Sequence, residues 1–187
     1  MRVYLTITII ILLAITACTT DQNMNKTVVI QTNKGTFEVQ LNHDKAPITT
    51  ENFLRYVNEG FYDGTVFHRV IPKFMIQGGG FTQDGKQKAV HDPIKLESNN
   101  GLKNTVGSIA MARTPDPNSA TSQFFINTAN NDFLNKGARD DGYAVFGKVV
   151  SGMDVVNTIG SVQTTKKHGM PDWPVEEVII QKAYVKQ

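Results

Sequence analysis

Cysteine is almost absent from this 187-residue sequence: Cys18 is the only one, so no disulfide can form within the chain. An excess of one charge sign is missing too, because 19 basic residues face 17 acidic ones and the basic residues are scattered. We therefore expect no nucleic-acid partner. The four histidines are dispersed without the spacing of metal ligands, which argues against a metal site.

The apolar run 3–15 is too short to span a bilayer, but it has the length of the hydrophobic region of a signal peptide. It follows Arg2 and closes with Ile15-Thr16-Ala17-Cys18. This ending resembles the lipobox of bacterial lipoproteins, in which the cysteine is acylated and becomes the new N-terminus. The alternative is cleavage by the ordinary signal peptidase, which prefers small residues three and one before the cut. The large Ile15 disfavours that alternative.

The N-terminal pattern divides the chain into three parts. We predict a signal peptide at 1–17, a lipidated tether at 18–26 and one folded domain at 27–187, without internal repeats. Several acyl chains on Cys18 would anchor the protein stably to a membrane. The residue after the cysteine is Thr19 rather than aspartate. By resemblance to sorting in Gram-negative bacteria, this favours the cell envelope and the periplasmic face of the outer membrane.

The folded domain begins with a hairpin pattern and a helical one. Alternating segments at 27–32 and 36–41 flank Asn33-Lys34-Gly35, which predicts a β-hairpin. A helical pattern then begins at Pro47, and Gly60 is placed to end it. The apolar residues of this helix share one face, namely Phe53, Tyr56 and Val57.

Short strands dominate the rest of the chain. We predict one further helix at 153–159 and strands at 66–71, 74–77, 108–112, 123–126, 144–149 and 177–185. Many short strands with few helices are typical of a β-sandwich or a barrel, and the spacing does not choose between them.

Three sequence blocks carry a family resemblance. They are FHRVIPKFMIQGGG at 67–80, GSIAMARTPDPNSATSQFFIN at 107–127 and GYAVFGKV at 142–149. In order and spacing they resemble the cyclophilin family of peptidyl-prolyl cis-trans isomerases, over about residues 27–185. The resemblance implies a mainly β fold, an eight-stranded antiparallel closed barrel capped by two α-helices, with the site in a groove on its outer face.

Arg69 is the only arginine of the first block and stands among apolar residues near the amide of Gln77, without a nucleophile, a carboxylate pair or a metal-ligand cluster. Such a site suits an amide that twists rather than breaks. From spacing alone, Arg69 reads as a surface arginine in an ion pair, whereas the resemblance implies that it is catalytic. Amide rotation transfers no proton, so we expect a structural role for the neighbouring His68. Gly78-Gly79-Gly80 lacks the lysine and the spacing of a phosphate-binding loop.

The resemblance also assigns the remaining site residues. It implies that Gln77 acts with Arg69 in catalysis and that Gln77 and Gln123 hold the peptide backbone and Arg69. It implies main-chain contacts from Ala112 and Arg113 to the residue before proline, and a Tyr143 hydroxyl near the substrate carbonyl. The proline pocket would consist of apolar side chains, which without the resemblance read as ordinary core: Phe74, Met75, Phe125 and Leu134, with Phe133 at the rim.

Three positions depart from the well-known eukaryotic members, which carry tryptophan, asparagine and histidine where this chain has Phe133, Arg113 and Tyr143. All three resemble the bacterial branch of the family. The missing indole N–H removes a donor used in binding the inhibitor cyclosporin, which argues against tight inhibition.

We predict a cofactor-free, monomeric isomerase that accelerates X-Pro isomerisation during folding of exported proteins. Its partners would be proline-containing peptides, unfolded proteins and, through lipidated Cys18, a membrane. The alternative is a non-catalytic peptide-binding module or chaperone that uses the same groove. A structural lipoprotein is a third hypothesis, but it leaves the pocket residues unused. The presence of Arg69 together with its pocket favours the enzyme.

Overall fold

The computed structural model describes residues 25–187, so the predicted signal peptide and Cys18 lie outside the described residues. Ten strands, two α-helices and one short 3-10 helix follow one another in this part of the chain. In chain order they are β1 (Thr27–Thr32), β2 (Gly35–Leu41), α1 (Pro47–Asn58), β3 (Arg69–Ile71), β4 (Met75–Gly78), β5 (Ser108–Met111), β6 (Phe124–Asn127), η1 (Asp132–Leu134), β7 (Val145–Ser151), α2 (Met153–Ile159), β8 (Thr164–Lys167), β9 (Met170–Pro174) and β10 (Ile180–Val185). Within residues 25–187, no helix combines the length and the hydropathy needed to cross a membrane.

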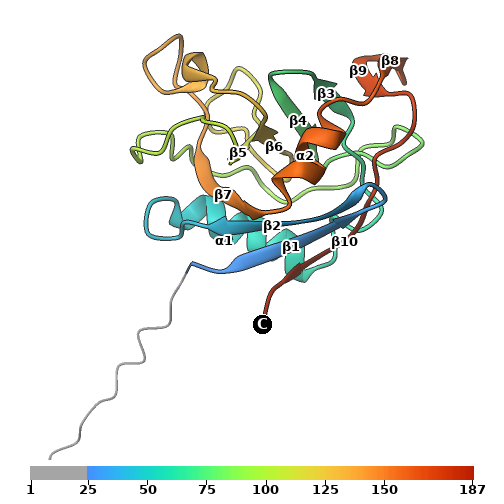
Figure 1. Ribbon diagram of the computed structural model, residues 1–187. Coiled ribbons are helices and arrows are strands. Elements are labelled where there is room, and N and C mark those ends of the chain that lie inside the picture. Colours follow the sequence, from blue (N-terminus) through green and yellow to red (C-terminus); the bar gives the residue numbers. More distant parts are fainter. Residues whose placement is uncertain (1–24) are drawn as a thin grey trace, which may run out of the picture.

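Eight strands form one curled antiparallel sheet in the order β10-β1-β2-β7-β5-β6-β4-β3, with β10 and β3 at its edges (Figure 1). Each of the eight predicted strands overlaps one of these. The predicted hairpin is confirmed, because β1 and β2 pair from Thr27 with Gln40 to Thr32 with Gly35. The β8–β9 hairpin lies outside this sheet and was not predicted.

The predicted closure of the barrel is wrong, since the sheet is a half-barrel with open edges. The strand expected at 66–71 is shortened to β3, Arg69–Ile71, and β3 does not pair with β10. Residues before β3 meet the chain before β10 only through a single bridge between Val66 and Ile179 and a few backbone hydrogen bonds, including Phe67 N–H to the Val178 carbonyl (2.9 Å). These contacts do not extend into a continuous ladder between the two edge strands.

Helix α1 begins at Pro47, as predicted, and receives its cap from a distant residue. The carboxylate of Glu97 accepts hydrogen bonds from the N–H groups of Ile48 (3.1 Å) and Thr49 (2.8 Å) and from the Thr49 hydroxyl (2.6 Å). These bonds satisfy donors that a helix N-terminus leaves without an intrahelical partner, and the negative charge matches the helix dipole. The loop that carries Glu97 is thereby attached to α1.

The concave side of the sheet holds the main core. Both helices bury side chains there, including Phe53 from α1 and Val156 from α2. Alternate residues of the strands point in opposite directions. In β6, Phe124 and Ile126 enter this core, whereas Phe125 joins a smaller apolar cluster on the other face. This second cluster also contains Met75, Ala110, Leu134 and Val145.

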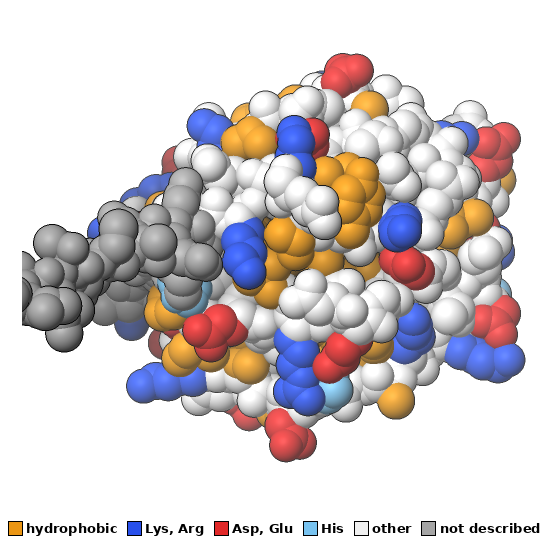
Figure 2. All heavy atoms as spheres, turned by 90° about the horizontal axis from the view of Figure 1, so that it is seen from below, with side chains coloured by type: hydrophobic (Ala, Val, Ile, Leu, Met, Phe, Trp, Pro, Cys, Tyr) orange, Lys and Arg blue, Asp and Glu red, His pale blue; other side chains and the backbone are white. Residues whose placement is uncertain are grey.

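Basic and acidic side chains are interspersed on the face shown in Figure 2, and neither sign forms a continuous patch there. This mixture agrees with the near balance of 19 basic and 17 acidic residues in the sequence.

Candidate active site

A row of side chains crosses the outer face of the sheet. Arg69 in β3 is directly opposite Gln77 in β4, Gln77 is opposite Phe125 in β6, and Phe125 is opposite Ala110 in β5. Residues directly opposite one another on antiparallel strands project to the same face. Residues up to 56 positions apart in sequence thus lie in one line, with the cation at the sheet edge.

A cavity of about 220 Å³ lies along this row. Its floor is apolar, because Met75, Phe125 and Leu134 are almost fully buried. Nine of the eleven predicted groove residues line it: Arg69, Phe74, Met75, Gln77, Ala112, Arg113, Phe125, Leu134 and Tyr143. The two predicted residues outside this lining are Gln123 and Phe133.

Arg69 contacts a residue that the sequence analysis missed. Its Nε lies 3.7 Å from Oδ2 of Asp172 in β9, and the Arg69 side chain keeps 41% of its surface exposed. Among residues 25–187, neither terminal amino group of the guanidinium has a hydrogen-bond partner. The ion pair suggested by spacing alone therefore exists, and it leaves both terminal amino groups of this cavity-lining residue available to a ligand.

Gln123 and Phe133 support lining residues instead of lining the cavity themselves. Gln77 Nε2 donates to Gln123 Oε1 at 3.0 Å, which fixes the orientation of the Gln77 amide. The ring of Phe133 stacks on Phe74 with centroids 5.6 Å apart, and Phe133 is 46% exposed. Phe133 therefore lies at the rim, next to the cavity.

The main chain at Ala112 and Arg113 is open to a ligand. The Ala112 N–H donates to the Gln123 carbonyl at 2.9 Å. Within the described part of the chain, the Ala112 carbonyl and the Arg113 N–H have no hydrogen-bond partner. One acceptor and one donor therefore remain at the cavity for an extended peptide.

The side chain of Arg113 has a role that the sequence did not indicate. It is buried, with 4% of its surface exposed, and its guanidinium donates to the Gly142 carbonyl (2.9 Å), the Thr114 carbonyl (2.9 Å) and Asp140 Oδ1 (3.0 Å). It also lies over the Tyr143 ring, 4.7 Å from its centroid. Together with the Gly142 N–H, whose hydrogen bond is the largest cause, Arg113 lowers the pKa of Asp140. Arg113 thus joins the 113–115 loop to the loop that carries Tyr143.

The family model described as "Cyclophilin type peptidyl-prolyl cis-trans isomerase/CLD" matches residues 27–185, which include every residue that lines the cavity. The chain belongs to the cyclophilin family. Two bacterial cyclophilins are similar to it. Peptidyl-prolyl cis-trans isomerase A of Dickeya dadantii is 54% identical, and the match covers 84% of this chain and 83% of the relative. Peptidyl-prolyl cis-trans isomerase B of Escherichia coli is 53% identical, and the match covers 86% of this chain and 99% of the relative.

A solved cyclophilin shares the fold at lower identity. The crystal structure of the cyclophilin-type isomerase cgd2_1660 of Cryptosporidium parvum has a TM-score of 0.73 to this chain at 29% identity. It covers 87% of this chain and 98% of its own. The same protein was also crystallised in the presence of the dipeptide Ala-Pro.

Four buried asparagines support the cyclophilin pocket from behind, and the sequence analysis missed them. Asn131 Nδ2 donates to the Phe74 carbonyl (2.9 Å) and to Asn127 Oδ1 (2.6 Å). Asn127 donates to Asn104 (3.1 Å), and Asn104 donates to the Leu134 carbonyl and to Asn135 (3.2 Å each). The carbonyls of two lining residues are thus held by one connected network. The recurrence of asparagine at positions 127, 131 and 135 was the available signal.

His68, next to Arg69, is buried and packs against aromatic rings. Its ring centroid lies 4.7 Å from that of Phe81 and 6.0 Å from that of Trp173, and its Nδ1 has no hydrogen-bond partner among the described residues. Burial, assisted by the charge of Arg69, lowers the pKa of His68 to about 4. The imidazole is therefore neutral at pH 7.

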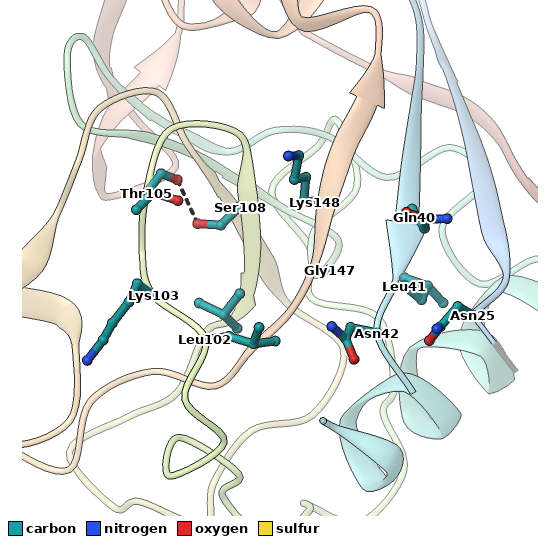
Figure 3. Close-up of a pocket in the computed structure, with 11 residues that line it drawn as sticks. Asn25, Gln40, Leu41, Asn42, Leu102, Lys103, Thr105, Ser108, Gly147 and Lys148 are labelled. Carbon is teal, nitrogen blue, oxygen red and sulfur yellow. Dashed lines mark hydrogen bonds between the residues drawn. The ribbon is translucent and has the colours of Figure 1, made fainter. Parts of the chain in front are cut away.

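A larger hollow, of about 320 Å³, lies between β2, β7 and the 102–105 loop (Figure 3). Its charged groups are Lys103 and Lys148, and in Figure 3 the Lys103 side chain extends away from the other lining residues. The Ser108 hydroxyl is already bound to the Thr105 carbonyl at 2.7 Å. This hollow is larger than the Arg69 cavity, but its lining contains no arginine or aromatic side chain comparable to those that line the Arg69 cavity.

Proposed function

We propose that this chain catalyses cis-trans isomerisation of X-Pro peptide bonds in exported proteins, with Arg69 as its main catalytic residue. The observation that carries the proposal is the apolar cavity lined by Arg69, whose two terminal amino groups have no hydrogen-bond partner within residues 25–187. Bacterial relatives 53–55% identical to the chain are named peptidyl-prolyl cis-trans isomerases.

The reaction requires rotation, not bond cleavage. The barrier to rotation of a peptide bond is roughly 18–20 kcal/mol, because resonance gives the C–N bond double-bond character. The two X-Pro isomers themselves differ by only about 0.5–1 kcal/mol. In the twisted transition state the proline nitrogen regains its lone pair. A site that binds this twisted form better than either planar form accelerates the exchange.

Arg69 supplies the interaction that planar substrates lack. Its guanidinium is charged at every working pH, and one of its free donors reaches the proline nitrogen as the lone pair develops. The proline ring occupies the apolar floor formed by Met75, Phe125 and Leu134. Burying an apolar group of this size contributes roughly 1.5–3 kcal/mol. The ring thus anchors the substrate while Arg69 stabilises the twist.

The other lining groups hold the peptide on either side of the proline. The Ala112 carbonyl and the Arg113 N–H bind the backbone before the proline as an added strand does. Gln77, oriented by Gln123 at 3.0 Å, binds the backbone beside Arg69. Tyr143, held by Arg113, directs its hydroxyl to the substrate carbonyl.

The decisive experiment compares the wild type with Arg69→Ala on a proline-containing tetrapeptide. Loss of an electrostatic donor of this kind typically costs about 3–4 kcal/mol, so we expect a 100- to 1000-fold fall in kcat/KM. Arg55→Ala is the matched control, because Arg55 is an exposed arginine on α1 paired with Glu59 and lies outside the cavity lining. A folded wild type that binds the peptide without accelerating exchange would favour the chaperone alternative.

We also propose that acylation of Cys18 attaches the domain to the cell envelope, at the periplasmic face of the outer membrane. The support is the sequence Ile15-Thr16-Ala17-Cys18 after an apolar run, followed by Thr19. The test is fractionation of cells that express the wild type or Cys18→Ser. We expect the wild type in the membrane fraction and the variant released from it. A wild type found only in the soluble fraction would contradict the anchor.

A further inference from the structure

The β8–β9 hairpin packs against the edge strand β3 (Figure 1), and two pairs of neighbouring residues meet across this contact. His68 and Trp173 form the inner pair, with ring centroids 6.0 Å apart. Arg69 and Asp172, each one position away, form the outer pair, with Nε and Oδ2 3.7 Å apart. The packing of the inner pair therefore determines where the outer carboxylate lies.

The hairpin is fixed at this point by the only tryptophan of the chain. Trp173 is fully buried, its Nε1 donates to Glu177 Oε2 at 2.9 Å, and the His168 ring meets it edge-on at 4.9 Å. Asp172 itself has φ 60°, a left-handed conformation that is uncommon outside glycine but several-fold enriched for Asp and Asn. The backbone is thus held in an unusual conformation next to the catalytic arginine.

We propose that Asp172 is a positioning residue for Arg69. Its carboxylate lies nearest Nε of the guanidinium, whereas neither terminal amino group has a hydrogen-bond partner within residues 25–187. Held in this way, the planar guanidinium presents those two groups to the cavity, where the twisted amide needs them. Without Asp172, the half-exposed Arg69 side chain would sample other rotamers, and its productive orientation would be less populated. The proposal rests on the isomerase function proposed above.

The test is kinetic analysis of Asp172→Asn in the full chain, with a proline tetrapeptide as substrate. Asparagine keeps the shape of the side chain and tolerates the same φ, so the substitution removes the charge alone. Because the pair is half exposed, we expect kcat to fall about two- to fivefold, in the range of exposed ion pairs. KM should stay unchanged, because Arg69 acts on the transition state and not on the ground state.

Two further variants separate positioning from a general effect. In an Arg69→Ala background, Asp172→Asn should have no additional effect on kcat. Glu176→Gln is the matched control, because it removes the partner of an exposed ion pair with Lys34 (3.1 Å) close to the hairpin without touching Arg69. We expect it to retain wild-type kcat.

Several results would overturn the proposal. They are an unchanged or increased kcat in Asp172→Asn, a change confined to KM, the same loss in the Arg69→Ala background, or an equal loss in Glu176→Gln. A folded wild type without isomerase activity would overturn the proposed function and this inference together. An active wild type with an equally active Asp172→Asn would overturn this inference alone.

Discussion

Protonation of His68 should make the stability of the fold fall steeply in mild acid. The ring is 3% exposed, lies between Phe81 and Trp173, and has no hydrogen-bond partner for Nδ1 among the described residues. Burial, and then the charge of Arg69, lowers its pKa from 6.5 to about 4. The folded state therefore binds this proton much more weakly than the unfolded chain does.

The difference between pKa 6.5 and about 4 determines both the size and the pH range of the effect. At about 1.36 kcal/mol per pKa unit, it corresponds to about 3 kcal/mol of unfolding free energy. As the pH falls, the unfolded chain takes up the proton first, so the folded state loses stability. The contribution of the neutral His68 ring to the unfolding free energy is fully present above pH 6.5 and is lost between pH 6.5 and about 4. Below pH 4 the ring is protonated in both states, so the unfolding free energy changes no further through His68.

The assay is urea unfolding at several pH values between 7.5 and 4, for the wild type and for His68→Gln and His68→Phe. Neither variant can be protonated at this position, so both should lose less stability than the wild type over this range, by about 3 kcal/mol. Comparing the pH dependence, and not the stability at one pH, cancels any packing defect that the substitutions introduce. If both variants retained the wild-type dependence on pH, the argument from burial would be refuted.

Two other substitutions test polar groups that support or line the pocket. Asn127→Leu removes the partner of Asn104 (3.1 Å), Asn131 (2.6 Å) and the Ser108 hydroxyl (2.9 Å) in a buried network. Because each unsatisfied buried group costs about 1–3 kcal/mol, the unfolding free energy in urea should fall by about 3 kcal/mol; a loss below about 1 kcal/mol would show that the network rearranges. Arg113→Lys cannot reproduce the planar set of donors, so the loop carrying Tyr143 should loosen, with a stability loss of about 2 kcal/mol and a raised KM for the tetrapeptide. Wild-type stability and KM in this variant would contradict the role of Arg113.

The elements of the fold could be read from local sequence because each leaves a local pattern. The alternation around Asn33-Lys34-Gly35 predicted the β1–β2 hairpin. Pro47 and the apolar face that follows it predicted α1. The β8–β9 hairpin was missed because β8 (TTKK) is polar, β9 (MPDWP) contains two prolines, and neither strand shows alternating burial. Its Trp173 is fully buried and packs against two residues far away in the chain, His68 and Phe81.

The site was predictable to the extent that a resemblance identifies residue positions. Nine of the eleven groove residues named from the sequence line one cavity. Asp172 and the buried asparagines were not found, because their partners are far away in the chain: Asp172 is 103 positions from Arg69, and Asn131 binds a carbonyl 57 positions earlier. Cys18 and the localisation that depends on it stay predictions from sequence.

The sequence by itself determined both α-helices and the approximate positions of the eight strands of the main sheet, and it placed Arg69 among apolar residues. Only the tertiary structure decided that the sheet stays open between β3 and β10, because closure depends on how far two edge strands extend past one another. It also decided which groups meet around Arg69. Local patterns depend on neighbours a few residues away, whereas the contacts of Arg69 with Asp172 and of Arg113 with Gly142 depend on long-range packing that no local pattern encodes.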